Sequence, residues 1–99
     1  MEESDNNPDS SGTYRFILFI SGMSIKSGHA IENFRKICDK HLAGRFQLQI
    51  VDITRDKHLA MEHQIIAVPT LIKIQPAPRR IILGDLSETK KVLKILDIN

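Results

Sequence analysis

The chain has 99 residues, enough for one domain with a two-layer core and too few for a second domain. Its apolar fraction of 41% and charged fraction of 26% are typical of a globular protein. The single cysteine excludes an internal disulfide and favours a reducing compartment, so we expect a cytoplasmic protein. The longest apolar run, residues 16–20, is far shorter than the roughly 20 residues that span a bilayer. No signal-peptide pattern precedes that run, so we expect no membrane segment.

The formal net charge of +2 hides a difference between the start of the chain and the rest. Residues 1–13 hold four acidic residues and no Lys or Arg, which leaves 14 basic against 8 acidic residues in the remainder. This first segment is rich in Ser, Asp, Asn and Gly without apolar periodicity, so we predict a disordered tail. The basic remainder is either an ordinary solvated surface or a surface that favours an acidic partner.

The first predicted elements are a strand and a helix. Residues 14–20 form a short, continuous run of aromatic and β-branched side chains, typical of a central strand covered on both faces. Apolar residues at three- and four-residue spacing then predict a helix over residues 27–43. Ser24 or Ser27 is its expected N-cap, and Gly44 its C-terminal stop.

Residues 46–53 alternate apolar and polar side chains before a short apolar end, which predicts a second, less covered strand. Two strands joined by a helix make a βαβ unit, so we expect the strands to be parallel. Asp56 is placed to cap a short helix from Lys57 to about Gln64.

The stretch from Ala67 to Ser87 contains three prolines and two apolar runs, the pattern of a β-hairpin with a rigid connection. Ser87 is the predicted N-cap of a last helix, with Glu88 in its first turn and Lys90, Lys91 and Lys94 on its exposed side. The order β-α-β-α-β-β-α, with a mixed four-stranded sheet and helices on both faces, predicts a single thioredoxin-like domain over residues 14–99.

The predicted fold raises the possibility of redox chemistry, which needs a Cys-x-x-Cys pair at the start of the first helix. That position reads Ser24-Ile25-Lys26-Ser27, and two hydroxyls do not exchange disulfides. Cys38 lies in the middle of the apolar helix stripe, which favours a buried structural thiol. The alternative is a redox or stress-sensing thiol.

No other catalytic, metal or cofactor pattern is present. The four histidines lack the spacing of a metal site, and no Gly-x-Ser-x-Gly or Gly-rich phosphate loop occurs. Nucleic-acid binding is also disfavoured, because the basic residues near the C-terminus have no aromatic residues among them. We therefore expect a binding scaffold without catalytic residues, metal or cofactor.

Several segments make the chain resemble the KaiB family, small partner proteins of the KaiC ATPase in bacterial clocks and clock-like systems. The resemblance rests on Ser21-Gly22, Ser27, Ala30, Gly44 with Phe46-Gln47-Leu48, Val51-Asp52-Ile53, Leu59-Ala60, residues 65–71 (IIAVPTL) and residues 79–87 (RRIILGDLS). The last two blocks are long and unusual in composition, so the family signal is strong.

This resemblance implies a metamorphic protein-interaction module without enzymatic activity. KaiB-like proteins have an oligomeric ground state, here a dimer or tetramer, and a thioredoxin-like monomer that binds the KaiC ring. The two folds would differ after about residue 52. Pro69 resembles the cis-proline of thioredoxin-like domains. The output is timekeeping or stress adaptation, and a KaiB-like sensor domain of a histidine kinase is an alternative.

The resemblance makes five residues candidates for partner contact: His29, Gln64, Arg79, Arg80 and Asp85. Three positions depart from the family pattern, with His29 in place of Arg, Gln64 in place of Lys, and residues 76–81 (PAPRRI) in place of Pro-Pro-Pro-Val-Arg-Arg. Ile95 replaces a common Gly, which favours a continuous last helix and the thioredoxin-like state. The chain ends at Asn99 without an acidic tail, which suggests either a truncated chain or a divergent, non-cyanobacterial member.

Overall fold

The computed structural model describes residues 13–98 and contains the predicted order of strands and helices. The elements are β2 (Tyr14–Ile20), α1 (Ile25–His41), β3 (Phe46–Asp52), α2 (Lys57–Glu62), β4 (Thr70–Gln75), β5 (Arg80–Leu83) and α3 (Thr89–Ile95). Residues 1–12 of the predicted tail lie outside the described residues. Thr13 is described, and its carbonyl accepts a hydrogen bond of 3.4 Å from the Gln75 amide side chain.

The four strands form one sheet in the order β3-β2-β4-β5. β2 and β3 are parallel, from Tyr14 opposite Phe46 to Ile20 opposite Asp52, as the βαβ interpretation requires. β4 is antiparallel to β2, and β4 and β5 form the predicted hairpin with Thr70 opposite Leu83. β2 is therefore an inner strand, which explains why its residues 16–20 are all buried.

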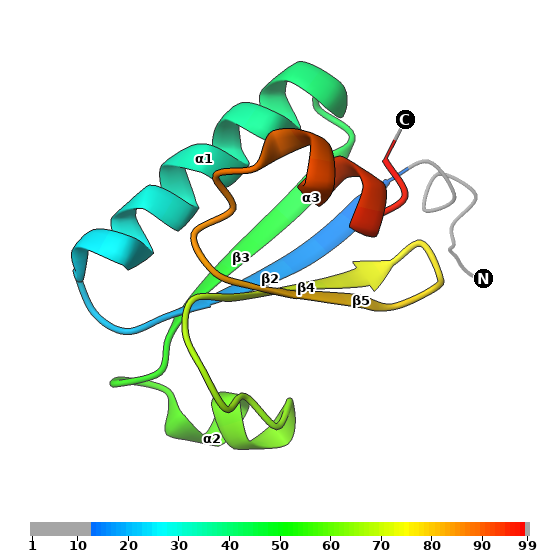
Figure 1. The fold of residues 1–99 in the computed structure, drawn as a ribbon. Coiled ribbons are helices and arrows are strands. Elements are labelled where there is room, and N and C mark those ends of the chain that lie inside the picture. Colours follow the sequence, from blue (N-terminus) through cyan, green and yellow to red (C-terminus); the bar gives the residue numbers. More distant parts are fainter. Residues whose placement is uncertain (1–12, 99) are drawn as a thin grey trace.

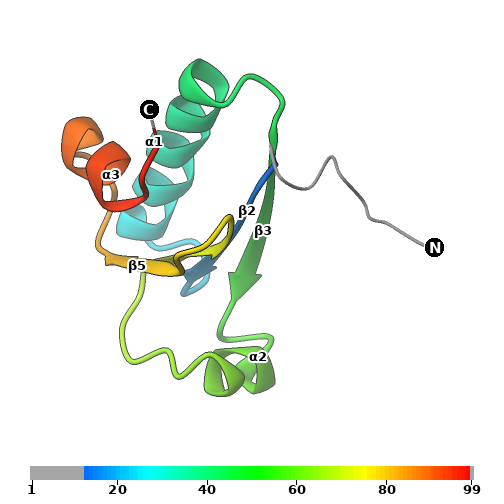
Figure 2. The ribbon, with the colours of Figure 1, turned by 90° about the vertical axis from the view of Figure 1, so that its right-hand side faces the viewer.

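One face of the sheet is covered by α1 and α3, and we call it the two-helix face (Figures 1 and 2). The predicted apolar stripe of α1 is turned inward, and Phe34 meets Phe16 of β2 edge to face with ring centroids 4.7 Å apart. The buried cluster on this face holds thirteen side chains: Phe16, Leu18, Ile20, Ala30, Phe34, Ile37, Cys38, Leu42, Leu71, Leu86, Val92, Leu96 and Ile98. Most of the core lies here.

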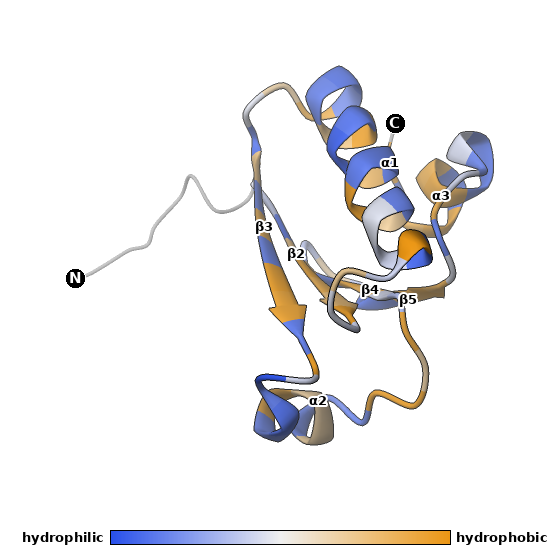
Figure 3. Ribbon diagram, turned by 90° about the vertical axis from the view of Figure 1, so that its left-hand side faces the viewer, coloured by the Kyte–Doolittle hydropathy of each residue, from blue (hydrophilic) through white to orange (hydrophobic). Residues whose placement is uncertain are grey.

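The opposite side of the sheet, which we call the α2 face, has a much smaller cluster. Among residues 13–98, the buried apolar side chains of this cluster are Ile17, Phe19, Val51 and Ile72, and α2 has no buried residue of its own. Leu59 of α2 and Ile65 and Val68 of the following segment pack against this cluster. That segment, largely orange in Figure 3 because its residues are apolar, leads from α2 back to β4. Ile81 and Leu83 of β5 remain 48% and 58% exposed.

The boundaries of α1 differ by two residues from the prediction of 27–43. The helix begins at Ile25 because Ser24 is the N-cap, and the Ser24 hydroxyl accepts a hydrogen bond from the Ser27 amide. It ends at His41, and Gly44 beyond it has a φ of 82°, a conformation that glycine adopts without the steric cost of a Cβ. Asp56 caps α2 as predicted, accepting from the Leu59 amide at 3.1 Å.

The predicted N-cap of the last helix is wrong. Glu88 precedes the first turn of α3 without a side-chain cap, so Glu88 is not in that turn either. Ser87 lies one residue earlier, where its own amide donates to the Asp85 carboxylate at 3.1 Å. A turn stabilised by an aspartate side chain thus takes the place of the expected serine cap, a competition that these short polar residues commonly produce.

The hairpin and its flanks contain the prolines. The peptide bonds Val68–Pro69, Gln75–Pro76 and Ala77–Pro78 are cis. The Pro69 carbonyl accepts a hydrogen bond of 3.0 Å from the Gly84 amide, which extends the pairing of β4 and β5 by one step. Among residues 13–98, no helix has the length and apolar character needed to cross a membrane.

Candidate interaction surface

The first turn of α1 occupies the position of the redox pair in thioredoxins, and here it is a network of hydroxyl groups. The Ser24 hydroxyl donates to the Ser27 hydroxyl at 2.8 Å, and the Ser27 oxygen also accepts from the Ser21 amide at 3.2 Å. Ser27 is only 1% exposed. These contacts close the β2–α1 loop and leave no acid–base partner beside either serine, so they hold the backbone rather than perform chemistry.

Asp52 connects this loop to the end of β3. One oxygen of its carboxylate accepts from the Gly22 amide at 3.0 Å, the Thr54 amide at 2.9 Å and the Thr54 hydroxyl at 2.7 Å. The Thr54 hydroxyl, followed by the two amides, holds the pKa of Asp52 below its usual range. The aspartate is therefore a tie between two loops at the carboxyl ends of two parallel strands.

Cys38, the alternative redox residue, is buried against the sheet. Burial, helped by the neighbouring Asp39 carboxylate, raises the pKa of the Cys38 thiol to about 12. The reactive form of a cysteine is the thiolate, which is nearly absent at neutral pH with such a pKa. The geometry therefore supports the structural interpretation of Cys38 and disfavours the redox alternative.

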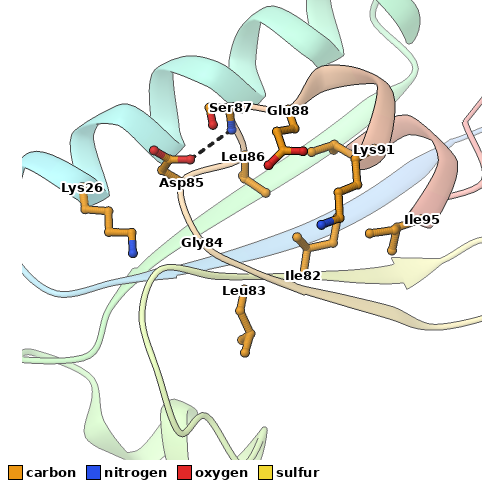
Figure 4. Close-up of a pocket in the computed structure, with 11 residues that line it drawn as sticks. Lys26, Ile82, Leu83, Gly84, Asp85, Leu86, Ser87, Glu88, Lys91 and Ile95 are labelled. Atoms are coloured by element: carbon orange, nitrogen blue, oxygen red, sulfur yellow. Dashed lines mark hydrogen bonds between the residues drawn. The ribbon is translucent and has the colours of Figure 1, made fainter.

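A concave feature on the two-helix face lies where α1, α3 and the loop between β5 and α3 meet (Figure 4). Its volume is about 320 Å³, at the small end of ligand pockets. Ile82, Leu86, Val92 and Ile95 supply its apolar lining. Lys26 reaches in from α1 and Lys91 from α3, with the Gly84–Asp85 segment between them. A cavity of this volume has room for one or two side chains of another protein.

Asp85 and its loop are held in place by hydrogen bonds within the loop and to α1. The Ser87 hydroxyl and then the Ser87 amide keep the pKa of Asp85 below its usual range, and the charges of Lys26 and His29 act in the same direction. The Asn33 side chain of α1 donates to the Asp85 carbonyl oxygen at 2.8 Å. Leu86, which follows, has a φ of 63° and is only 4% exposed.

The five partner-contact candidates fall in three separate places. His29 and Asp85 come together beside the cavity, where His29 is exposed. Arg79 and Arg80 lie at the far end of the hairpin, and Arg80 is occupied by an ion pair with Asp97 at 3.3 Å. Gln64 follows α2 on the opposite side of the sheet, with a φ of 56°. One continuous contact surface therefore includes His29 and Asp85 but not the other three.

Sequence reasoning missed Lys73. This lysine is 1% exposed in β4, and its ammonium donates to the Leu96 carbonyl at 2.9 Å and lies 3.7 Å from the Asp97 carboxylate. It also lies 6.0 Å from the centre of the Tyr14 ring. The position of Lys73 two residues after Leu71 could have indicated that it is buried, since alternate residues of a strand share a face. Lys73 ties the end of α3 to the sheet.

The helices of the two-helix face are strongly basic. α1 and α3 together carry seven Lys and Arg residues and two acidic residues, whereas α2 carries one Lys and one Glu. We define the basic face as the exposed side chains of Lys36, Lys40, Lys90 and Lys94. Lys36 and Lys40 line a hollow of about 170 Å³ between the helices, which Thr89 closes from α3. Lys36 is 3.9 Å from Glu32, and the other three form no ion pair with any residue from 13 to 98.

The fold and the site define a protein of the thioredoxin-like class that has neither the cysteine pair nor another catalytic group at the usual place. Solved structures agree on the fold. The N-terminal domain of Synechococcus elongatus SasA aligns with a TM-score of 0.72 at 18% identity, covering 98% of this chain and 93% of that domain. Chloroplastic thioredoxin z aligns with a TM-score of 0.70 at 14% identity, covering 89% and 81%.

Sequence comparison identifies the family. The model of the KaiB domain matches residues 17–98. Circadian clock protein KaiB3 of Synechocystis is 42% identical over 81 residues, covering 82% of this chain and 79% of that protein. Circadian clock oscillator protein KaiB of Prochlorococcus marinus is 40% identical over 86 residues, covering 87% and 82%. The chain belongs to the KaiB family, as its sequence motifs predicted.

Proposed function

We propose that this protein is a non-catalytic interaction module of a KaiB/KaiC-type system, which binds a KaiC-like ATPase in its thioredoxin-like form. The observation that carries the proposal is the family match over nearly all of residues 14–98, joined to a structure in the thioredoxin-like arrangement. Binding would regulate clock-like or stress-adaptation output in the cytoplasm. The proposal includes exchange with a ground state in which the chain after about residue 52 is rearranged and self-associates.

The surface we assign to the ATPase is the rim of the cavity in Figure 4, with Asp85 at its edge. His29 belongs to this surface because it lies near enough to Asp85 to act on its carboxylate. The apolar lining offers burial to a side chain of the partner, while the two lysines and two acidic residues around it select orientation. Arg79 and Gln64 would then lie outside the primary contact.

The test is co-sedimentation or pull-down with the KaiC homologue of the same organism, in the presence of ATP and after long incubation. The expected result is a stable complex with the native chain and a loss of about tenfold in affinity for His29→Glu, since a new negative charge at a rim costs of this order. Lys57→Glu is the matched control, because Lys57 is exposed on α2 away from the cavity. Absence of any complex would remove the proposal.

A second candidate, the sensor domain of a histidine kinase, is favoured by the alignment with the SasA N-terminal domain. The full reading frame distinguishes the two, because a sensor domain would continue into a kinase. The redox alternative has no such support, given the buried Cys38 thiol with its raised pKa.

A further inference from the structure

The two edge strands of the sheet differ in the side chains that they expose. β3 is the edge strand on one side, and its exposed side chains, Gln47 and Gln49, are polar. β5 is the edge strand on the other side, and Ile81 and Leu83 remain about half exposed there. Proteins commonly protect an edge strand with polar or charged residues, because an apolar edge is a template for pairing with another chain. The edge at β5 lacks that protection.

The backbone of β5 is also positioned for pairing. The Gly84 amide donates to the Pro69 carbonyl, so Gly84 turns its backbone groups toward β4. Successive residues of an antiparallel strand turn these groups to alternate sides. The N–H and C=O groups of Ile81 and Leu83 therefore point away from β4. Among residues 13–98, no further strand of the sheet lies beyond this edge.

A strand added at β5 would meet apolar side chains on both faces of the sheet. Figure 4 shows Ile82 on the side of the cavity below α3 and Leu83 pointing the other way. Ile95 of α3 shares the lining of the cavity with Ile82. Strand addition combines main-chain hydrogen bonds with pockets for alternate side chains. The residue of the added strand opposite Ile82 would thus enter the cavity, and its two neighbours would cover Ile81 and Leu83.

Charges at the two ends of β5 give this edge a direction. Arg79, just before the strand, is exposed and forms no ion pair with any residue from 13 to 98. Asp85, just after the strand, is held in its ionised form by its hydrogen bonds, which lower its pKa. Opposite charges on facing residues of neighbouring strands attract and like charges repel. An antiparallel strand that begins with a basic residue and ends with an acidic one matches both ends.

We propose that β5 binds an extended segment of another protein as an added antiparallel strand. The segment has apolar residues opposite Ile81 and Leu83 and in the cavity, a basic residue opposite Asp85 and an acidic residue opposite Arg79. The inference rests on the proposed function in one respect, because the rim of this cavity is the surface assigned to the ATPase. Its tests use a peptide and no ATPase, so a failure here leaves the pull-down result unaffected.

The first test uses the peptide acetyl-Lys-Thr-Val-Leu-Val-Thr-Glu-amide, which has the required pattern. We expect amide shift changes in β5 and none in β3, and slower hydrogen exchange of the Ile81 and Leu83 amides. The same peptide with N-methyl groups on both valines lacks the N–H groups that face β5 and should bind about tenfold more weakly. Equal binding of the two peptides overturns the proposal. So do β5 shifts that follow protein concentration alone, since the occupant would then be a second copy of the chain.

The second test concerns direction. Exchanging the terminal lysine and glutamate of the peptide keeps its composition and places like charges opposite Arg79 and Asp85. We expect about fivefold weaker binding, since two exposed charge pairs are changed. Arg79→Glu should weaken binding of the first peptide, and a peptide with lysine in place of its glutamate should recover the loss. Absence of any preference between the peptides overturns the antiparallel assignment.

The third test changes the edge itself. Ile81→Lys together with Leu83→Lys places two charges on half-exposed positions of β5, and we expect at least about a tenfold loss of peptide affinity. Gln47→Lys together with Gln49→Lys adds the same charge to exposed positions of β3 and is the matched control, which should keep the affinity. Circular dichroism checks that both variants fold. Equal effects of the two pairs of substitutions contradict binding at β5.

Discussion

The two faces of the sheet are covered in different ways. On the two-helix face, a 17-residue helix and α3 bury thirteen side chains against the strands and present a basic exterior. On the α2 face, a six-residue helix with no buried residue and the segment after it pack against four buried side chains. The difference indicates that the stability of the domain comes mainly from one side. The other side is the one more easily rearranged, because less apolar burial opposes its opening.

The largest effect is expected from removing a buried aromatic ring on the two-helix face. Phe34→Ala deletes a fully buried side chain that meets Phe16, so we expect a loss of about 3 to 5 kcal/mol in the free energy of unfolding. Leu59→Ala on α2 removes a half-buried side chain and should cost about 1 kcal/mol. Urea denaturation followed by circular dichroism measures both. Equal losses would contradict the asymmetry between the faces.

The rate at which cysteines on the two faces react with iodoacetamide is a second test of the asymmetry. With a pKa of about 12, Cys38 is thiolate in about one molecule in ten thousand at pH 8. We expect iodoacetamide to label native Cys38 about a thousandfold more slowly than the urea-unfolded chain. Met61→Cys on α2 is the control, since residue 61 is 77% exposed and its thiol should label at the rate of an unfolded cysteine. Rapid labelling of native Cys38 would revive the redox interpretation.

The same pKa predicts a loss of stability at high pH. The Cys38 thiol resists ionisation in the folded state, so its contribution is fully present below the unfolded pKa of about 9. It is lost as pH rises from there towards about 12, because only the unfolded chain gains the thiolate. Thermal unfolding of the native chain and Cys38→Ala across this range should show a steeper decline for the native chain.

The attachment of α3 is tested at Lys73. Lys73→Met keeps the apolar stem and removes the ammonium, which leaves the Leu96 carbonyl without its side-chain donor, so we expect a loss of about 1 to 3 kcal/mol. Arg80→Gln removes only the half-exposed pair with Asp97 and should cost less than about 1 kcal/mol. Equilibrium unfolding in urea distinguishes them. A Lys73→Met protein as stable as the native chain would show that α3 docks through its apolar side chains alone.

The smallest expected effects concern two aspartates. The pKa values of Asp52 and Asp85 are lowered by hydrogen bonds in the folded state, so their contribution to stability is present above the usual carboxyl pKa and is lost as pH falls below it. Asp52 joins two loops, whereas the Asp85 carboxylate accepts from the nearby Ser87 amide. Asp52→Asn should therefore reduce the acid sensitivity of the melting temperature more than Asp85→Asn. Melting curves from about pH 5 to about pH 3 give the order.

Most of the fold could be predicted because the elements with the strongest periodicity are also the most deeply packed. The inward stripe of α1 and the continuous apolar run of β2 both turned out as the sequence indicated. The error at Ser87 arose because capping depends on the competing local hydrogen bond of Asp85. The burial of Lys73 was not predicted, because a lysine is ordinarily expected to be exposed.

The candidate surface was less predictable than the fold. His29 and Asp85 are far apart in the sequence, yet they meet because α1 packs beside the β5–α3 loop. Gln64 and Arg79 carry equally plausible chemistry and lie elsewhere. The four charged residues that line the cavity are Lys26, Asp85, Glu88 and Lys91, and they come from α1, the β5–α3 loop and α3. No spacing along the chain could therefore group them.

By itself, the sequence determined the order of the elements, the inward residues of each, the lack of a redox pair and the family. These are properties of one segment at a time, because hydrophobic period and turn residues act over a few neighbours. Only the tertiary structure decided which helices share a face, that Lys73 ties α3 to the sheet, and that Lys26, Asp85, Glu88 and Lys91 surround one cavity. Packing of distant segments sets those distances, and no local pattern records them.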